Sequence, residues 1–391
     1  ESENITVTVP AGNPITIKSL VLAAGAGGQA NFNAKSPLTV SEYAYVCSGG
    51  TLTLDVYNDS GEAPNVVSND VVVYSGGKIT HSGNKSTENA KLHLAVLGDM
   101  TVHEGGEVTA TKKGYSKTAC PHGTVPMGSS ASHAGYGKQN HAPYGSIFRP
   151  LSWGGGTSDE PGGGAIHLIV SGNITVNGTI EAEGGGNNSH YSGAGGSIWL
   201  ECASLMGSGL VSARQGLNRF DLSYTSSGGR VAVYQRTAKD FSAFPKSRIL
   251  ATRNKVAACG TVYLESASSS VAGADLYIET DTSTNYSTQF PMDEDGDAST
   301  CYANVNLIIG KGGKVVVPRG ADDKPREIRL RSLMLSSSNS TLNLGVNTFI
   351  VTDPSWRRDK DWASRSVTVD LYNKVPGKIV YLSRGTMIFI R

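Results

Sequence analysis

A short motif, glycine followed by alternating apolar residues, recurs at nearly constant spacing in this chain. Its copies begin at Gly163, Gly195, Gly228 and Cys259. Each copy predicts a short strand with two apolar side chains on one face. A fixed period of this length is typical of solenoids, in which each repeat buries its apolar face against the next. The sequence therefore predicts an all-β fold, a right-handed parallel β-helix (β-solenoid) with coils of about 32 residues.

Alignment of the copies predicts which side chains share a column along the stack. One inward column contains Ile166, Ile198, Val231 and Val262. The outward residues of the same strands form two columns. The first contains His93, His167, Trp199, Ala232 and Tyr263, and the second contains Ile169, Glu201, Tyr234 and Glu265.

A long insertion separates two of the coils. Leu92 repeats the pattern of Ile166 but lies more than two periods before it, so the chain between them is much longer than one coil. The segment 111–162 is rich in Gly, Ser, His and Pro and has no strand pattern, so the insertion is expected there. We expect coils over 1–280, an acidic loop over 281–302, and further strands over 303–391 that continue or cap the solenoid.

Two segments carry a resemblance to a known family. Gly163–Gly185 and the following Gly193–Leu200 resemble the glycine-rich β-helix segments of secreted bacterial and protist surface proteins. Cys120-Pro121-His122-Gly123 is similar to the Gly-Asp-Pro-His domain of diatom adhesive and cell-wall proteins, with Ala119-Cys120 in place of Gly-Asp. The likeness covers residues 90–265. It implies an extracellular adhesive or structural role and supplies no reaction.

Composition excludes two classes of partner. The net charge is +1, and there is no basic stripe of the kind that binds nucleic acid. No apolar run is long enough for a membrane-spanning helix. Five spread cysteines without a CxxC pair predict two disulfides and one free thiol in an oxidising compartment, with Cys120 bonded to a neighbouring loop.

Eight N-x-S/T sequons agree with a secreted glycoprotein at the cell surface or outside the cell. Their asparagines are Asn4, Asn58, Asn84, Asn173, Asn177, Asn187, Asn285 and Asn339.

Two loops are candidates for ligand binding. The insertion contains His133 and Tyr136, which predict either a metal-binding loop or a structural network of hydrogen bonds and stacked rings. The acidic loop contains Asp293, Asp295 and Asp297 around one glycine. These carboxylates could bind Ca²⁺, which prefers several hard oxygen ligands, or form a solvated loop.

The outward columns give the main functional hypothesis. His93, His167, Trp199, Tyr234 and Tyr263, with Glu201 beside them, would form a flat aromatic surface for glycans or for another protein. Alternatively, the insertion folds over this surface and buries it.

We therefore expect a secreted structural or adhesive protein that contacts glycans, surface proteins or further copies of itself. The alternative is a polysaccharide lyase or glycoside hydrolase on a β-helix. No nucleophile motif is present, and no residue is assigned to catalysis.

Overall fold

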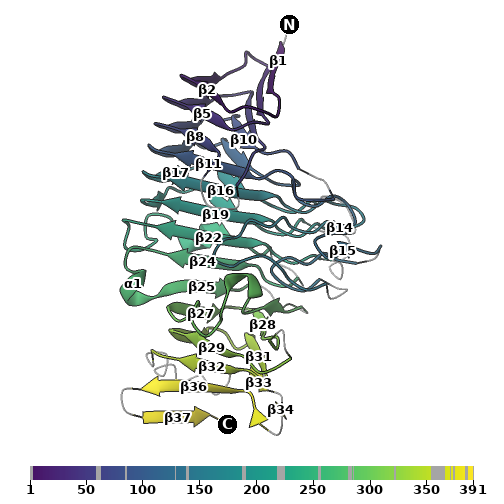
Figure 1. The fold of residues 1–391 in the computed structure, drawn as a ribbon, viewed down its shortest axis with the longest axis vertical. Coiled ribbons are helices and arrows are strands. Elements are labelled where there is room, and N and C mark those ends of the chain that lie inside the picture. Colours follow the sequence, from purple (N-terminus) through teal and green to yellow (C-terminus); the bar gives the residue numbers. More distant parts are fainter. Residues whose placement is uncertain are drawn as a thin grey trace.

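The protein is nearly all β, and its sheets are mostly parallel. This computed structural model describes residues 3–58, 63–83, 86–127, 129–137, 141–186, 191–217, 225–253, 257–280, 284, 286–320, 323–353, 366–369, 371–372, 375–383 and 386–390. Figure 1 shows the strands stacked along one long axis, from the N-terminal strand at one end to the last hairpin at the other.

Three parallel sheets build the first two thirds of the stack. Sheet A contains β1 (Asn4–Val9), β4 (Gln29–Ala34), β7 (Gly50–Leu54), β10 (Lys78–Thr80), β13 (Glu107–Thr109), β18 (Thr179–Glu181), β21 (Leu210–Ser212) and β23 (Ile249–Leu250). Sheet C contains β3 (Leu20–Leu22), β6 (Ala44–Val46), β9 (Val71–Val73), β12 (Met100–Val102), β17 (Ile174–Val176) and β20 (Leu205–Met206).

Sheet B has eleven strands and runs through most of the molecule. It contains β2 (Ile15–Ile17), β5 (Leu38–Val40), β8 (Asn65–Val67), β11 (Leu92–Val96), β16 (Ala165–Val170), β19 (Ser197–Cys202), β22 (Arg230–Gln235), β24 (Thr261–Glu265), β25 (Ala274–Ile278), β27 (Val305–Ile309) and β30 (Ser332–Leu335). From β2 to β21 the chain visits sheets B, C and A in turn, so each set of three strands is one repeat of the stack.

The predicted strand register is confirmed. Ile166 pairs with Leu92 and Ile198, and the column continues through Val231 to Val262. All are 5% exposed or less and belong to one apolar core between the three sheets. The first outward column is also in register, from His93 through His167, Trp199 and Ala232 to Tyr263. The same pairings align Ile169, Glu201, Tyr234 and Glu265.

The glycines of the sequence motif lie where long loops leave the end of sheet A and return to sheet B. In Figure 1 these loops extend to one side as a layered wing. Backbone hydrogen bonds join the layers: Gly163 N donates to Ala194 O (2.9 Å), and Gly195 N donates to Ser227 O (3.1 Å). A Cβ on Gly163 or Gly195 would come within 2.1 Å of a carbonyl oxygen. The layers pack so closely that only glycine fits at these positions.

The insertion belongs to this wing. It leaves after β13 and returns at β16, and between them the described residues contain one short hairpin, β14 (Ala119–Cys120) and β15 (Gly123–Thr124). Trp153 anchors it, because the side chain is fully buried and its indole N–H donates to Ala90 O at 3.0 Å.

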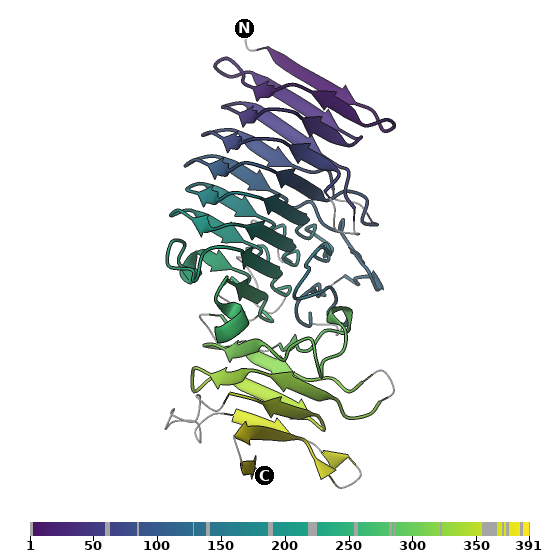
Figure 2. The same cartoon turned by 60° about the vertical axis from the view of Figure 1, so that its left-hand side comes forward.

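Sheet B changes its buried face between β24 and β25. These two strands are antiparallel, whereas the other neighbours in the sheet are parallel. Val262 faces the first core, but the next residue, Tyr263, belongs to a second core with Leu276 and Ile278. The outward face of the earlier repeats thus continues into the interior of the C-terminal part (Figure 2).

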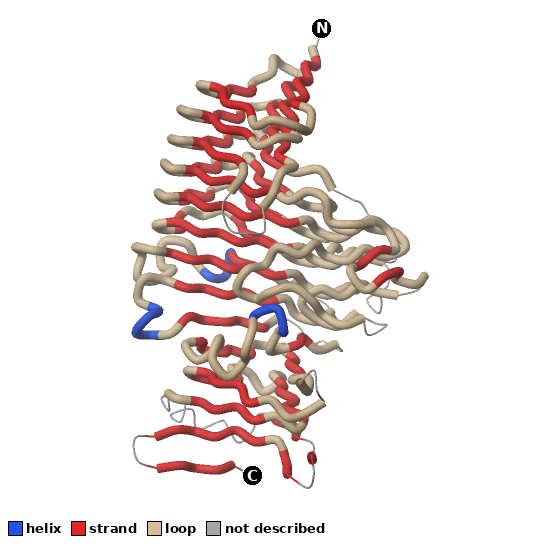
Figure 3. The backbone as a smooth tube through the Cα atoms, in the orientation of Figure 1, coloured by secondary structure: helices blue, strands red, loops and turns tan. Residues whose placement is uncertain are grey.

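Two further sheets enclose this second core. Sheet F contains β26 (Thr288–Gln289), β28 (Lys314–Val316), β31 (Thr341–Gly345) and β33 (Ser366–Val369), and sheet G contains β29 (Glu327–Leu330), β32 (Thr348–Val351), β36 (Lys378–Ser383) and β37 (Thr386–Ile390). The remaining elements are β34 (Leu371–Tyr372), β35 (Val375–Pro376), α1 (Ser269–Ala272), η2 (Lys246–Arg248) and η3 (Asp293–Asp295). Figure 3 shows how little helix the described residues contain, and none of it could cross a membrane.

Candidate functional site

The predicted aromatic surface on sheet B is largely covered. His93 and His167 are each 1% exposed and Tyr263 is 5% exposed. The rings stack along the column as predicted: the His93 and His167 centroids are 4.4 Å apart, and those of His167 and Trp199 are 3.8 Å apart. Trp199 and Tyr234 remain partly exposed.

Over Tyr234 and Tyr263 the cover comes from the insertion and from the loop that follows β26. At the other end of the column, Asn58 N donates to His93 Nδ1 at 3.4 Å. Phe148 of the insertion packs edge-on against Tyr263, with centroids 4.9 Å apart, and lies 5.1 Å from Tyr302. The Tyr234 hydroxyl donates to Phe148 O at 2.8 Å. The structure therefore favours the second of the two alternatives, and the contact surface predicted at His93, His167 and Tyr263 is corrected to a buried seam. Their rings contribute to packing because the second core begins on this face.

At the edge of the seam, Glu201 links a buried histidine to a surface arginine. Its carboxylate accepts from His167 Nε2 (3.1 Å) and from Arg236 (3.3 Å). Burial lowers the pKa of His167, although Glu201 acts in the opposite direction. Partial burial acts to raise the pKa of Glu201, but the donors outweigh it and the pKa is lowered.

His133 and Tyr136 of the insertion form structural contacts. His133 lies 2.6 Å from Gly195 O through Nδ1, and its ring packs 5.0 Å from Tyr144. The Tyr136 hydroxyl donates to Gln289 at 3.1 Å. Burial lowers the pKa of His133 to about 3. The sequence predicted either a metal-binding loop or a structural network here. These contacts are those of a structural network. Within the described residues, no group of three His, Cys, Asp or Glu side chains is placed to hold a metal.

The acidic loop binds the insertion. Asp295 accepts hydrogen bonds from Ile147 N (2.9 Å), from Ser146 and from the Tyr302 hydroxyl. Asp293 pairs with Arg326 at 2.6 Å, and Asp297 accepts from Ser299 N at 2.9 Å. Each of the three carboxylates accepts from a protein donor, and calcium binding by this loop stays a prediction.

A buried arginine completes this junction. Arg230 on β22 is fully buried, and its guanidinium donates twice to Tyr144 O, at 3.1 and 3.0 Å. Burial lowers its pKa, while Asp295 and Glu294 act to raise it. Burial raises the pKa of Asp295, opposed by its donors and by Arg230. The junction thus ties the stack, the insertion and the acidic loop together.

The five cysteines are all free thiols. Cys120, Cys202 and Cys259 are buried, and the Cys120 thiol donates to Gly123 O at 3.3 Å. The predicted disulfides, including the bond from Cys120 to a neighbouring loop, are therefore corrected. Secretion remains a prediction that rests on the sequons and on the glycine-rich resemblance.

Five of the eight sequon asparagines lie within the described residues. Asn4, Asn58 and Asn177 are exposed, whereas Asn173 and Asn339 are partly exposed. Asn84, Asn187 and Asn285 lie outside the described residues.

An aromatic surface that the sequence analysis did not identify lies on sheet C and at its edge. We call it the tyrosine ladder: Tyr43, Tyr45, Tyr74 and His103. The Tyr43 and Tyr45 rings stack at 4.4 Å, Tyr45 meets Tyr74 edge-on at 6.2 Å, and Tyr74 stacks on His103 at 5.1 Å with only 15° between the planes. Tyr74 is 40% exposed, His103 is exposed, and the other two rings are partly exposed.

Local structure explains why these rings point outward. Tyr45 is the central residue of β6 between buried Ala44 and Val46, so the alternation of the strand turns it to solvent. Tyr74 and His103 follow β9 and β12 directly, and each precedes a tight turn with a positive-φ glycine, Gly76 and Gly105. The signal was present in the sequence, because Gly76-Gly77 and Gly105-Gly106 follow closely after Tyr74 and His103. These glycine pairs precede strands of sheet A, whereas the pairs used to align the later repeats precede strands of sheet B.

Polar groups lie next to Tyr43, at one end of the ladder. Glu42 accepts from the Ser19 hydroxyl (2.7 Å) and pairs with Lys18 (3.4 Å), which has an 82% exposed side chain. Protein hydroxyls and carboxylates beside aromatic rings suit sugar binding. The sugar hydroxyls need hydrogen-bond partners, and the C–H faces of the sugar ring need apolar contacts.

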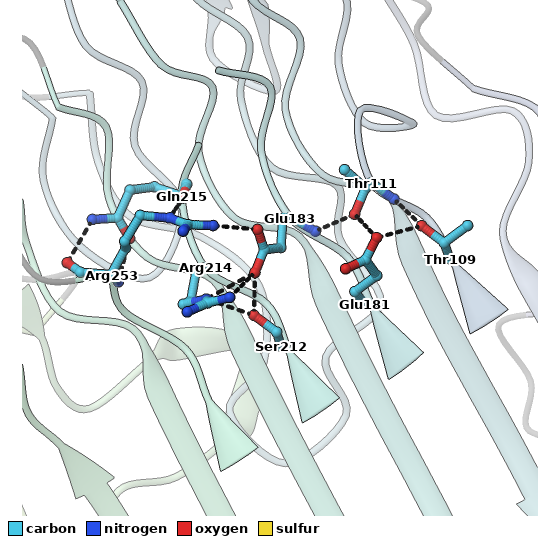
Figure 4. A network of polar contacts seen from close by, with 8 residues as sticks. All are labelled: Thr109, Thr111, Glu181, Glu183, Ser212, Arg214, Gln215 and Arg253. Atoms are coloured by element: carbon cyan, nitrogen blue, oxygen red, sulfur yellow. Dashed lines mark hydrogen bonds and ion pairs between the residues drawn. The ribbon is translucent and has the colours of Figure 1, made fainter. Parts of the chain in front are cut away.

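A second polar cluster lies at the end of sheet A (Figure 4). Glu183 accepts from Arg214 Nε at 2.8 Å, from the Ser212 hydroxyl and from Arg253. Glu181, two residues earlier on the same face, accepts from the Thr109 and Thr111 hydroxyls, both at 3.2 Å. Burial raises the pKa of Glu181, and the charge of Glu183 adds to this shift.

The same corner of the stack contains a hollow of about 590 Å³ in the early repeats. It is lined by Lys35, Asp55, Val56, Tyr57, Ser82 and Asn89. Five of its six lining residues carry a polar group, and Asp55 already accepts from Ser82 N at 2.6 Å.

Comparison with models of protein families, with curated proteins and with solved structures finds no match to this chain. Function must therefore be argued from the surfaces described above.

Proposed function

We propose that this chain is a right-handed parallel β-helix that acts outside the cell as a structural or adhesive protein, and that it contacts glycans through the tyrosine ladder. The β-helix is supported by sheets A, B and C, whose strands recur in turn and pair in parallel from repeat to repeat. Parallel connections of this kind are right-handed in nearly all proteins.

The single observation that carries the glycan proposal is the row of four rings in contact, of which Tyr74 and His103 are exposed and the other two partly exposed. Large aromatic side chains on the surface of a rigid sheet lose little entropy on binding, because neighbouring rings already fix them. Tyr74 and His103 stack face to face, with 15° between their planes. A fixed row of rings of this kind offers apolar ring edges and tyrosine hydroxyls to the sugar units of a glycan.

A binding measurement tests the proposal. Wild-type protein is titrated with a panel of neutral and acidic polysaccharides, and Tyr74→Ala and Tyr45→Ala are compared on any that binds. We expect each variant to weaken binding at least about tenfold, which corresponds to about 1.4 kcal/mol.

Val271→Ala is a matched control, because Val271 is apolar and 77% exposed but lies on α1. Absence of binding to every polysaccharide, or equal binding by the tyrosine variants, would contradict the proposed role of the ladder.

A second candidate function is cleavage of a polysaccharide at Glu181 and Glu183. The observation that favours it is the raised pKa of Glu181 beside a carboxylate that two arginines hold. In extended chain, Cα atoms two residues apart are separated by about 6.6 Å, a spacing from which two side chains on one face can bring their carboxyl groups within the range of about 6.5–9.5 Å found in inverting glycosidases. New reducing ends from wild type that disappear in Glu181→Gln would support this function, whereas an inactive wild type would reject it.

A further inference from the structure

The hollow of about 590 Å³ opens at the corner where the chain passes from sheet A to sheet B in the early repeats. We call it the corner hollow. The loops that follow β4, β7 and β10 line it, and each of these strands pairs with a neighbour on both edges. The hollow therefore lies on the side of the stack, between repeats. Pockets of about 300–1,000 Å³ hold small ligands in proteins. The lining residues are Lys35, Asp55, Val56, Tyr57, Ser82 and Asn89.

One wall of the corner hollow is a row of polar side chains. Because β4, β7 and β10 pair in register, the residues just beyond their ends, Lys35, Asp55 and Ser82, follow one another down the stack. Asp55 N donates to Ala34 O at 3.1 Å, and Ser82 N donates to Asp55 Oδ1 at 2.6 Å. The Asp55 carboxylate is thus held through one oxygen. Its other oxygen has no hydrogen-bond partner within the described residues.

The aromatic part of the lining is Tyr57, which contacts with the interior hold in place. The Lys91 ammonium lies over the Tyr57 ring, 4.4 Å from its centroid, and Lys91 is only 5% exposed. Glu88 pairs with Lys91 at 3.2 Å and accepts from Trp153 N at 2.8 Å. Because Trp153 anchors the insertion, these contacts tie Tyr57 to the rigid part of the molecule. A ring that is already fixed loses little freedom when a ligand binds.

The remaining lining groups narrow the class of ligand. One ammonium and one carboxylate leave the lining without net charge, which disfavours a phosphate or another multiply charged anion. Val56 is the only aliphatic residue among the six, so a lipid chain would find little apolar contact. Within the part of the chain that the structure describes, the side chains of Lys35 and Asn89 have no hydrogen-bond or ion-pair partner. Both are therefore available as donors.

We propose that the corner hollow is a binding site for a short saccharide. Sugar hydroxyls both donate and accept hydrogen bonds, and the lining supplies partners of both kinds. The second oxygen of Asp55 accepts from the sugar, and Lys35 and Asn89 donate to it. The Tyr57 ring gives the C–H face of a sugar ring an apolar contact.

The corner hollow is separate from the tyrosine ladder. Tyr74 precedes β10 and Ser82 follows it, so the two sites lie at opposite ends of the same strand of sheet A. They share no residue. The saccharide site therefore does not rest on the role proposed for the ladder, and each can fail without the other.

Saturation-transfer NMR and titration calorimetry on the full chain test the site, with mono- and disaccharides of neutral hexoses, amino sugars and uronic acids as probes. We expect at least one of these sugars to bind with one site per chain. Asp55→Asn keeps an oxygen for Ser82 N but removes the charge, and Tyr57→Ala removes the ring. Each should raise the dissociation constant at least about tenfold, because a charged hydrogen bond or an aromatic contact is lost.

Asp240→Asn is a matched control, because Asp240 is an exposed carboxylate that also accepts from a backbone N–H, that of Ser242 at 2.9 Å, but lies outside the hollow. It should bind the sugar as wild type does, and melting of Asp55→Asn should match that of this control. Binding by none of the probes, or unchanged binding in both Asp55→Asn and Tyr57→Ala, would overturn the proposal. A sugar that is lost in Tyr74→Ala and retained in both hollow variants would belong to the ladder and would overturn it as well.

Discussion

Two aromatic columns project outward from the same stack and have opposite environments. The column on sheet B, from His93 to Tyr263, is covered by other parts of the chain, with the insertion at its Tyr263 end, and its two ends are 1% and 5% exposed. The tyrosine ladder on sheet C has no such cover from the described residues, and Tyr74 is 40% exposed. Strand alternation assigns both to the outer face. The difference shows that an outward position defines a contact surface only when no other part of the chain packs on it.

The largest expected effect comes from removing one ring from each column. Tyr263→Ala should lower the free energy of unfolding by about 3–5 kcal/mol, because it leaves a cavity beside Phe148 and Leu276. Tyr74→Ala should change it by less than about 0.5 kcal/mol, since the site is open. Denaturant titration of both variants measures the contrast, and similar values would remove the distinction between the columns.

The next effect is a loss of folding stability at acidic pH. Burial lowers the pKa of His81 to about 4 and that of His133 to about 3, from an ordinary value of 6.5. The unfolded chain therefore binds more protons than the folded chain below pH 6.5. Stability should be fully present above that pH and fall by about 1.4 kcal/mol per pH unit for each histidine as the pH drops toward 4.

Because His133 belongs to the insertion and His81 packs against it, this loss of stability should follow the docking of the insertion on the stack. His81 stacks on Trp153, and His133 packs on Tyr144. Melting of wild type, His133→Gln and the surface control His103→Gln over pH 4–7 measures the slope. If stability depended on pH equally steeply in His133→Gln and in wild type, buried His133 would not be a source of the pH dependence.

The smallest effect is expected at the rim of the seam. Arg236 has a 45% exposed side chain and pairs with Glu201 at 3.3 Å. Arg236→Ala should cost less than about 1 kcal/mol because solvent and salt screen such a pair. Added salt should reduce the difference further in thermal melts. A cost as large as that of Tyr263→Ala would mean that the covered seam extends to this arginine.

The regular part of the fold could be predicted from sequence. Ile166, Ile198, Val231 and Val262 were assigned to one inward column, and the structure pairs them. Period and alternation contain this information, because parallel pairing between repeats aligns equivalent positions.

The contacts between the repeats and their loops could not be predicted in this way. The packing of Phe148 on Tyr263 occurs once and does not recur from repeat to repeat. The same holds for the hydrogen bonds of Asp295 to the turn at Ile147. They depend on how a long loop returns across a sheet. The disulfide prediction failed for a related reason: it rested on the number of cysteines and on an oxidising compartment, and neither places two thiols side by side.

The exchange of buried face at β24 and β25 has a consequence for how this chain can be divided. Sheet B is one continuous ladder of hydrogen bonds, yet Val262 and Tyr263 belong to different cores. A cut between them would expose apolar surface on both halves. The first half would have uncovered aromatic rings, and the second would have an unpaired sheet edge. Neither half could be gained, lost or exchanged in evolution as a self-sufficient module. We expect gene fragments that end near residue 265 to yield insoluble protein even though every strand of the first core is present.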